Sequence, residues 1–183
     1  MRVYFDTGPF IDYLSTRGTA NALLRSAERR GRHPVEIASD AERIFEKVSK
    51  THASATSCLT FYEVEEALYR MLAQSAKGIS RADTLLIPAA RSITTQVQIV
   101  VELFNVSVLD LTAETVRLQL RQLDLQTRGI RAADAIHAAT AIGFRADLLI
   151  SADDAILSLD RMLVNAEGNK IICADTDRAL KLL

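Results

Sequence analysis

Four acidic residues, spread along the chain, stand where a short apolar run meets the expected start of a helix. They are Asp6 in VYFDTGPF, Glu63 in TFYEVEEAL, Asp134 in RAADAIHAATAI and Asp153 in LLISADDAIL. Open α/β sheets bind ligands at the carboxyl ends of their strands. If the apolar runs are parallel strands, the four carboxylates gather at one edge of one sheet. Crowded carboxylates repel one another unless a hard divalent cation lies among them, so the pattern indicates a metal site.

Apolar runs alternate with helical patterns, which predicts an α/β fold with a central parallel sheet of about five strands between two layers of helices. The expected strands span residues 2–5, 55–59, 106–109, 148–150 and 170–173. Helices are expected from Pro9 onwards and over residues 37–48, 60–77, 80–104, 112–127, 131–143 and 153–163. Pro88 lies inside one of these helices and predicts a kink or break there.

Composition is typical of a globular domain in a reducing compartment. At 183 residues and 49% hydrophobic content, the chain has enough material for one domain, residues 1–183, with a real core. No apolar run approaches the ~20 residues that cross a bilayer, and Asp6 interrupts the first run before a signal segment could form. Cys58 and Cys173 lie in apolar runs, which favours a cytoplasmic protein. The sequence also lacks the P-loop, GxGxxG and GxSxG motifs of nucleotide-binding enzymes and serine hydrolases.

Each of the four acids also has an ordinary structural explanation, because carboxylates are favoured at helix N-termini. Glu63 comes three residues after a threonine and fits a capping box, and Asp154 stands in the same relation to a serine. Asp134 fits a first-turn acid. Asp6 is the hardest to explain in this way, because it directly follows an apolar strand and aspartate is depleted in strands. The recurrence of all four acids at strand ends or helix starts favours a shared function.

Other residues are alternatives for a place in the site. Glu66 lies one helical turn after the first glutamate of its segment, and Asp175 and Asp177 follow the last expected strand. His137 comes three residues after an aspartate of the quartet and so lies on the same helical face. It is a ligand, a base or, more simply, an inward-facing histidine with a hydrogen bond. Asp12 is expected to be solvated.

The charge distribution leaves room for only a local basic surface. The formal net charge is −1, which is not the broad positive surface of many nucleic-acid-binding proteins. The densest basic stretch is LLRSAERRGRH, with Arg25, Arg29, Arg30 and Arg32. One interpretation is a solvated helix end, where the helix dipole favours cations. The other is a surface that contacts RNA phosphates.

Taken together, these segments resemble the PIN-domain ribonucleases, and within them the VapC-type toxins of toxin–antitoxin pairs. YFDTGPFIDYL is similar to the first motif of that family, TSCLTFYEVEEAL to its S/T-x-x-T-x-x-E-V helix start, and AADAIHAATAI to its D-A-x-x-A-A-T-A motif. LLISADDAIL resembles the family's strand ending in T-x-D, with Ser151 in place of the threonine. The resemblance covers nearly the whole chain. Residues 15–52 make a longer segment than in compact members, and an extended helical insertion is expected there.

The resemblance implies a PIN-like three-layer α/β/α fold and an Mg²⁺- or Mn²⁺-dependent endoribonuclease. On it, the catalytic acids are Asp6, Glu63, Asp134 and Asp153. Asp6, Asp134 and Asp153 would be the metal ligands, and Ser151 would help to order the site. The expected reaction is metal-assisted hydrolysis of an RNA phosphodiester bond.

The same resemblance implies the partners. These are tRNA or rRNA as substrate, a cognate antitoxin, and a second copy of the chain in a homodimer formed through the helices between residues 60 and 104. No membrane association is expected. Two alternatives stay open: a PIN nuclease that serves RNA processing and is not a toxin, and a non-catalytic binding module that has kept the PIN fold.

Overall fold

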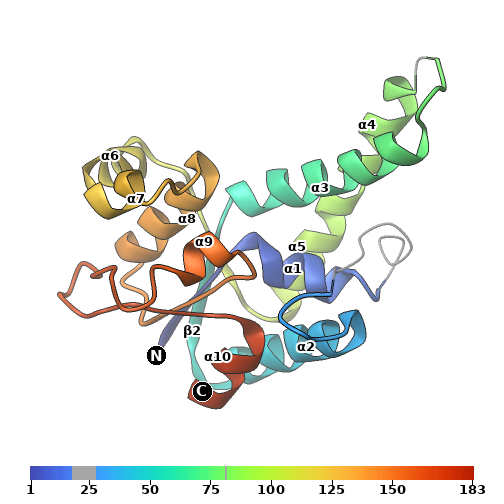
Figure 1. Cartoon of the computed structure of the whole chain (residues 1–183). Helices are drawn as coiled ribbons and strands as arrows, with labels where there is room; N and C mark the ends of the chain where they lie inside the picture. Colours follow the sequence, from blue (N-terminus) through green and yellow to red (C-terminus); the bar gives the residue numbers. More distant parts are fainter. Residues whose placement is uncertain (18–27, 81) are drawn as a thin grey trace.

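A five-stranded sheet lies at the centre of the fold, and helices cover both of its faces (Figure 1). The computed structural model describes residues 1–17, 28–80 and 82–183. Its strands are β1 (Arg2–Phe5), β2 (Ala53–Ser57), β3 (Ser107–Leu109), β4 (Leu148–Ile150) and β5 (Ile172–Ala174). Its helices are α1 (Thr7–Leu14), α2 (Pro34–Thr51), α3 (Leu59–Ser75), α4 (Asp83–Arg91), α5 (Ile93–Leu103), α6 (Ala113–Arg121), α7 (Leu123–Thr127), α8 (Ala132–Gly143), α9 (Asp154–Leu157) and α10 (Thr176–Leu182).

The strand order places β1 at the centre of the sheet. The order is β3-β2-β1-β4-β5, and every neighbouring pair is parallel. The chain builds the sheet outward from β1 to β3 and then continues on the other side of β1, so the winding reverses between β1 and β4. The crevice at such a reversal, outside the carboxyl ends of the strands, is where open α/β sheets bind ligands. The backbone N–H of Asp6 donates to the Ile150 carbonyl at 2.9 Å, so Asp6 leaves the sheet at the reversal itself.

Side chains that alternate along the strands divide the core into two layers. Val3 and Phe5 face the layer that contains α1, α2, α3, α5 and α10, whereas Tyr4 faces the layer that contains α8 and α9. In the first layer Phe5 stacks on Phe45, with ring centroids 4.5 Å apart. Full burial of one such ring contributes about 1.5–3 kcal/mol. These two layers hold the carboxyl ends of β1 and β4 in fixed positions.

The α/β fold with five parallel strands is confirmed, and each strand lies close to its expected range. The expected helix over 80–104 is two helices, α4 and α5, that meet at Ser92. Pro88 remains inside α4, and the break comes one turn later, where the Ser92 N–H donates to the Pro88 carbonyl at 3.1 Å. α10 has no counterpart among the predicted elements.

The helix expected over 153–163 is wrong beyond Leu157, where α9 ends. The chain there turns to meet the strand that follows. Arg161 has a φ of 58°, and its N–H donates to the Ile171 carbonyl at 2.9 Å. These long-range contacts replace the helical hydrogen bonds that the apolar spacing suggested.

An extended helical insertion over residues 15–52 stays a prediction. Within this range, residues 34–51 form α2, which packs against α1 and α10, and residues 29–32 form a tight turn. Arg25 lies outside the described residues, so its predicted role is not addressed by the structure.

α3 and α4 extend away from the sheet (upper right in Figure 1). Ile79, Leu85 and Ile87 are exposed along this arm, between the end of α3 and the middle of α4. Within residues 1–17, 28–80 and 82–183, no helix is both long enough and apolar enough to cross a membrane.

Candidate metal centre

The four acids predicted from the sequence line one depression of about 400 Å³. Each comes from a different element: Asp6 follows β1, Glu63 lies on α3, Asp134 lies in the first turn of α8, and Asp153 follows β4. Its other lining residues are Thr7, Gly8, Ile11, Arg70 and Ala152. The spacing argument therefore predicted correctly that these carboxylates lie together, while their catalytic role stays a prediction.

Asp6 is buried at the start of α1. It is the N-cap residue of that helix, yet its carboxylate turns towards the end of β4, where Oδ2 accepts from the Ser151 hydroxyl at 2.6 Å. Its Oδ1 lies 3.5 Å from Nε2 of His137. Partners outside its own helix hold this carboxylate, so ordinary helix capping does not explain Asp6.

Glu63 likewise points into the depression. Its Oε2 accepts from the hydroxyl of Thr7 and lies 2.8 Å from Nε2 of His137. Thr60, the other half of the expected capping box, is buried, and its Oγ1 lies 2.7 Å from that of Thr56. The capping-box alternative is therefore wrong for Glu63, and tertiary partners decide the direction of its side chain.

His137 holds Glu63 from the buried side. Its ring is fully buried, with Nδ1 lying 2.8 Å from the Tyr4 hydroxyl. Burial acts to lower the pKa of His137, but the negative charges of Asp6, Glu63 and Asp134 outweigh burial and raise it. Burial acts to raise the pKa of Glu63, but the hydrogen bond and charge of His137 outweigh it and lower that pKa. The two side chains form a part-buried hydrogen-bonded pair, and the histidine is inward-facing.

The donor set fits a hard divalent cation. Among the described residues, Asp6, Glu63 and His137 each offer one ligand atom, and these atoms lie within 4.8 Å of one another. Asp134 adds an electrostatic observation: burial, and then the charges of Asp153, Asp6 and Glu63, raise its pKa from 3.8 to about 6. A carboxylate whose ionisation is opposed by its neighbours gains most from a nearby divalent cation. Carboxylate oxygens are also the ligands that Mg²⁺ and Mn²⁺ prefer.

Asp153 is also the N-cap residue of α9. Its Oδ1 accepts from the Ala155 N–H at 2.6 Å, and its own N–H donates to Ser151 Oγ at 3.0 Å. The neighbouring Asp154 points outward, with 89% of its side chain exposed, and pairs with Arg30. Asp153, not Asp154, lines the depression, and the Ser151–Asp154 capping box is wrong.

Residues 29–32 form a two-residue hairpin turn. The backbones of Arg29 and Arg32 pair in both directions, at 3.3 and 3.0 Å. Arg30 and Gly31 have φ values of 51° and 69°, and the type I′ turn requires positive φ at both central residues. The turn directs its arginine side chains towards the body of the domain.

These arginines bind aspartates. Arg29 contacts Asp12 and Asp175, Arg30 contacts Asp175 and Asp154, and Arg32 contacts Asp40, Asp175 and Asp177. The expectation that Asp12 is solvated is wrong, because it is 2% exposed. Locally matched charge of this kind is not a solvated helix end. Contact between Arg29, Arg30 or Arg32 and RNA stays a prediction.

Arg70 was not among the candidates that the sequence suggested. Among the described residues that line the depression it is the only cation, and 73% of its side chain is exposed. Its Nε donates to Glu66 Oε1 at 2.9 Å, and Glu66, one of the alternative acids, does not line the depression. Arg70 comes seven residues after Glu63, two helical turns along the same face, and that spacing is the signal that could have found it.

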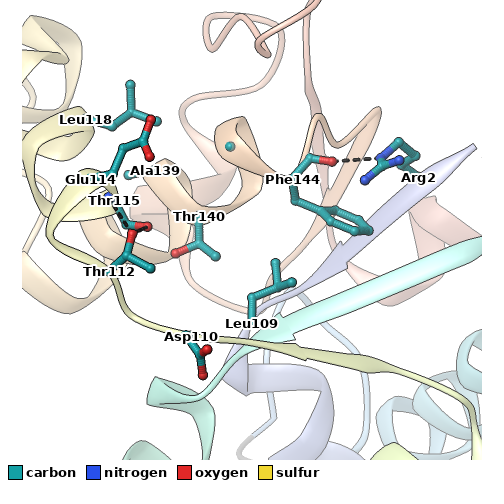
Figure 2. A pocket seen from close by; sticks show the side chains of 11 residues that line it. Arg2, Leu109, Asp110, Thr112, Glu114, Thr115, Leu118, Ala139, Thr140 and Phe144 are labelled. Carbon is teal, nitrogen blue, oxygen red and sulfur yellow. Dashed lines mark hydrogen bonds between the residues drawn. The ribbon is translucent and has the colours of Figure 1, made fainter.

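A second depression, of about 500 Å³, lies between α6, α8 and the end of β3 (Figure 2). Thr112, Leu118 and Thr140 line it, and Arg2 donates to the Phe144 carbonyl at 2.7 Å at one end. It is larger than the acidic depression, but none of the four predicted acids lines it.

Comparison with known proteins supports the fold. No family model matches the sequence, and no curated protein does. Among solved structures, the chain is similar to one in the crystal structure of VapBC2 from Rickettsia felis bound to a DNA fragment from their promoter. The TM-score is 0.51 and the identity 12%, over 96% of this chain and 98% of that chain. At this identity the likeness concerns the fold alone, and it confirms a PIN-like three-layer α/β/α architecture.

Proposed function

We propose that this chain is an Mg²⁺- or Mn²⁺-dependent endoribonuclease and the toxin of a VapBC-type toxin–antitoxin pair. The observation that carries the proposal is the convergence of Asp6, Glu63, Asp134 and Asp153 in one depression at the reversal of the sheet. The origin of the structural neighbour, a VapBC2 complex, supports the toxin assignment.

Each acid has a distinct part in the proposed site. Asp6 and Asp134 are the central ligands, and Glu63 and Asp153 act from the flanks. Ser151 fixes the Asp6 carboxylate through its hydroxyl, and His137 fixes Glu63 through its ring. A divalent cation held by these carboxylates would supply charge neutralisation at the scissile phosphate and would lower the pKa of an attacking water.

Arg70 is proposed to bind a phosphate of the RNA beside the carboxylates. The cluster of acids repels RNA, and the net charge of −1 provides no general attraction. A guanidinium at the rim of the same depression offsets that repulsion locally. Arg70 also pairs with Glu66, but it lines the depression and 73% of its side chain is exposed. The arginines of the 29–32 turn each contact at least two aspartates, so Arg70 is the stronger candidate for this contact.

The proposed partners are tRNA or rRNA, an antitoxin and a second copy of the chain. The exposed apolar side chains of the α3–α4 arm, Ile79, Leu85 and Ile87, support a homodimer formed through these helices. A protein that dimerises there would bury side chains that a monomer leaves in water.

A nuclease assay on purified tRNA and rRNA with Mn²⁺ tests the proposal. Wild type should cleave, Asp134→Asn should not, and Asp110→Asn should cleave like wild type. Asp110 is a matched control because it also follows a strand, β3, but lies outside the acidic depression. Cleavage without toxicity in cells would favour RNA processing. Folded protein that binds Mn²⁺ but cleaves neither RNA would favour a binding module.

A further inference from the structure

The guanidinium of Arg30 connects three parts of the molecule beside the acidic depression. Its Nη2 donates to the Ala152 carbonyl at 3.0 Å and to the Asp154 carboxylate, while Nη1 donates to Asp175 Oδ2 at 2.6 Å. Ala152 precedes Asp153 in the loop between β4 and α9, and Asp154, the first residue of α9, follows it. Arg30 therefore contacts both neighbours of Asp153, from the outer side of the loop.

Two further contacts hold the same loop from the side of the carboxylates. Ser151 Oγ donates to Asp6 and accepts from the Asp153 N–H. Gly8 of α1 packs against Ala152 so closely that a Cβ added to Gly8 would lie 2.6 Å from the Ala152 Cβ. The loop is thus enclosed between α1 and the 29–32 turn, and its outer contact comes from Arg30.

The backbone of Arg30 is itself held in an unfavourable conformation. Its φ of 51° is in the left-handed region, which costs an L-residue about 1–2 kcal/mol. Such conformations persist where surrounding contacts over-determine them, and they concentrate at functional sites. Here the contacts are the paired backbones of Arg29 and Arg32 and the three acceptors of the guanidinium.

We propose that Arg30 is a positioning residue for the carboxylate of Asp153. By tying the Ala152 carbonyl and Asp154 to the start of α10, it holds Asp153 in the depression that Asp134 and Asp6 also line. The inference rests on the proposed metal site. It gives the 29–32 turn a role in that site: external support for the loop that carries its fourth acid.

Loss of the positive charge of Arg30 and loss of its hydrogen bonds should change the affinity for a divalent cation in opposite directions. If Arg30 acted only as a positive charge near the site, its removal would tighten the binding of a divalent cation. If it positions Asp153, its removal weakens binding, because a displaced carboxylate no longer completes the ligand set. Removal of a residue that orients a metal ligand typically weakens affinity about 10–100-fold.

The test is the Kd of Mn²⁺ measured by titration calorimetry, together with the melting temperature without metal. Arg30→Ala should weaken Mn²⁺ binding about 10-fold or more. Arg30→Lys keeps the charge but loses the forked donor geometry, so it should also weaken binding. Arg32→Ala is the matched control: it removes the same charge from the same turn, but Arg32 contacts Asp40, Asp175 and Asp177, not the Asp153 loop. Its Mn²⁺ affinity should equal or exceed that of wild type.

The positioning role is overturned if wild type binds Mn²⁺ and both Arg30→Ala and Arg30→Lys bind it equally or more tightly. That result would leave the proposed function intact. Equal weakening by Arg30→Ala and Arg32→Ala also overturns the positioning role, because general destabilisation would then explain both. Wild type that binds no Mn²⁺ overturns the proposed function, and this inference with it.

Discussion

Nε2 of His137 lies 2.8 Å from Oε2 of Glu63, and the histidine ring is fully buried beneath the acidic depression. The ring is held on its other side by the Tyr4 hydroxyl, 2.8 Å from Nδ1. These hydrogen bonds connect Tyr4 of β1, His137 of α8 and Glu63 of α3, and they fix one wall of the acidic depression from inside the core. The pKa of His137 is raised from 6.5, so its pairing stabilises the fold below that pH and is lost as pH rises through the raised pKa.

Tyr4→Phe tests the hydrogen bond between the Tyr4 hydroxyl and His137. The change removes one hydroxyl and leaves Nδ1 of His137 buried without that partner, which typically costs about 1–3 kcal/mol. The melting temperature should fall by about 2–4 °C per kcal/mol for a chain of this size. Tyr62→Phe, at an exposed position on α3, is the control and should melt like wild type. Equal melting temperatures for both variants would mean that the Tyr4 hydroxyl does not support the ring.

Asp134 predicts a pH dependence of stability in metal-free protein. Its pKa in the folded state is about 6, above the ordinary 3.8, so the folded state binds more protons than the unfolded state between these values. Stability should therefore fall as pH rises through this range and level off above it. Asp134→Asn removes the effect. In excess chelator, the variant should melt above wild type near neutral pH, and the gap should close towards about pH 4. A gap that is independent of pH would contradict the crowding of carboxylates.

Gly8→Ala should damage both stability and metal binding. The added Cβ would lie 2.6 Å from the Ala152 Cβ and 3.0 Å from its backbone N, so α1 and the Asp153 loop must separate. Overpacking of this kind costs about 1–3 kcal/mol. Gly143→Ala is the matched control, because a Cβ there would meet no described atom within 4 Å. Calorimetric Mn²⁺ titration and thermal melting should separate the two variants. Wild-type affinity in a stable Gly8→Ala protein would refute the close contact.

Arg70→Ala should weaken RNA binding, while Mn²⁺ affinity should equal or exceed that of wild type because a positive charge beside the carboxylates is removed. Loss of one phosphate contact should reduce the slope of log Kd against log salt by about one unit. Arg91→Ala is the control, since Arg91 is similarly exposed, at 69%, but pairs with Glu65 outside the depression. Filter binding at several salt concentrations compares the RNA affinities of the two variants. Both variants are made in the inactive Asp134→Asn background. An unchanged slope for Arg70→Ala would exclude the proposed phosphate contact.

The sequence alone determined the five strands, most of the helices and the types of residue at their ends. Strands and most helices follow from local periodicity, and an aspartate such as Asp6 directly after an apolar strand is visible without a structure. Parallel strands share one carboxyl edge, so the grouping of Asp6, Glu63, Asp134 and Asp153 could also be predicted. The end of α9 at Leu157 could not be predicted from the sequence. Backbone hydrogen bonds to the segment just before β5 replace the helical hydrogen bonds that the apolar spacing suggested there.

Only the tertiary structure decided which partners orient the acids. Arg29 and Asp175 are 146 positions apart, and Tyr4 and His137 are 133 apart, and neither pairing leaves a local pattern in the sequence. The strand order brings β4 beside β1, which places Ser151 on Asp6 and makes Asp153 a neighbour of the site. Side-chain direction depends on such distant contacts, and for that reason the basic turn at residues 29–32 lies against aspartates where its composition suggested a free surface.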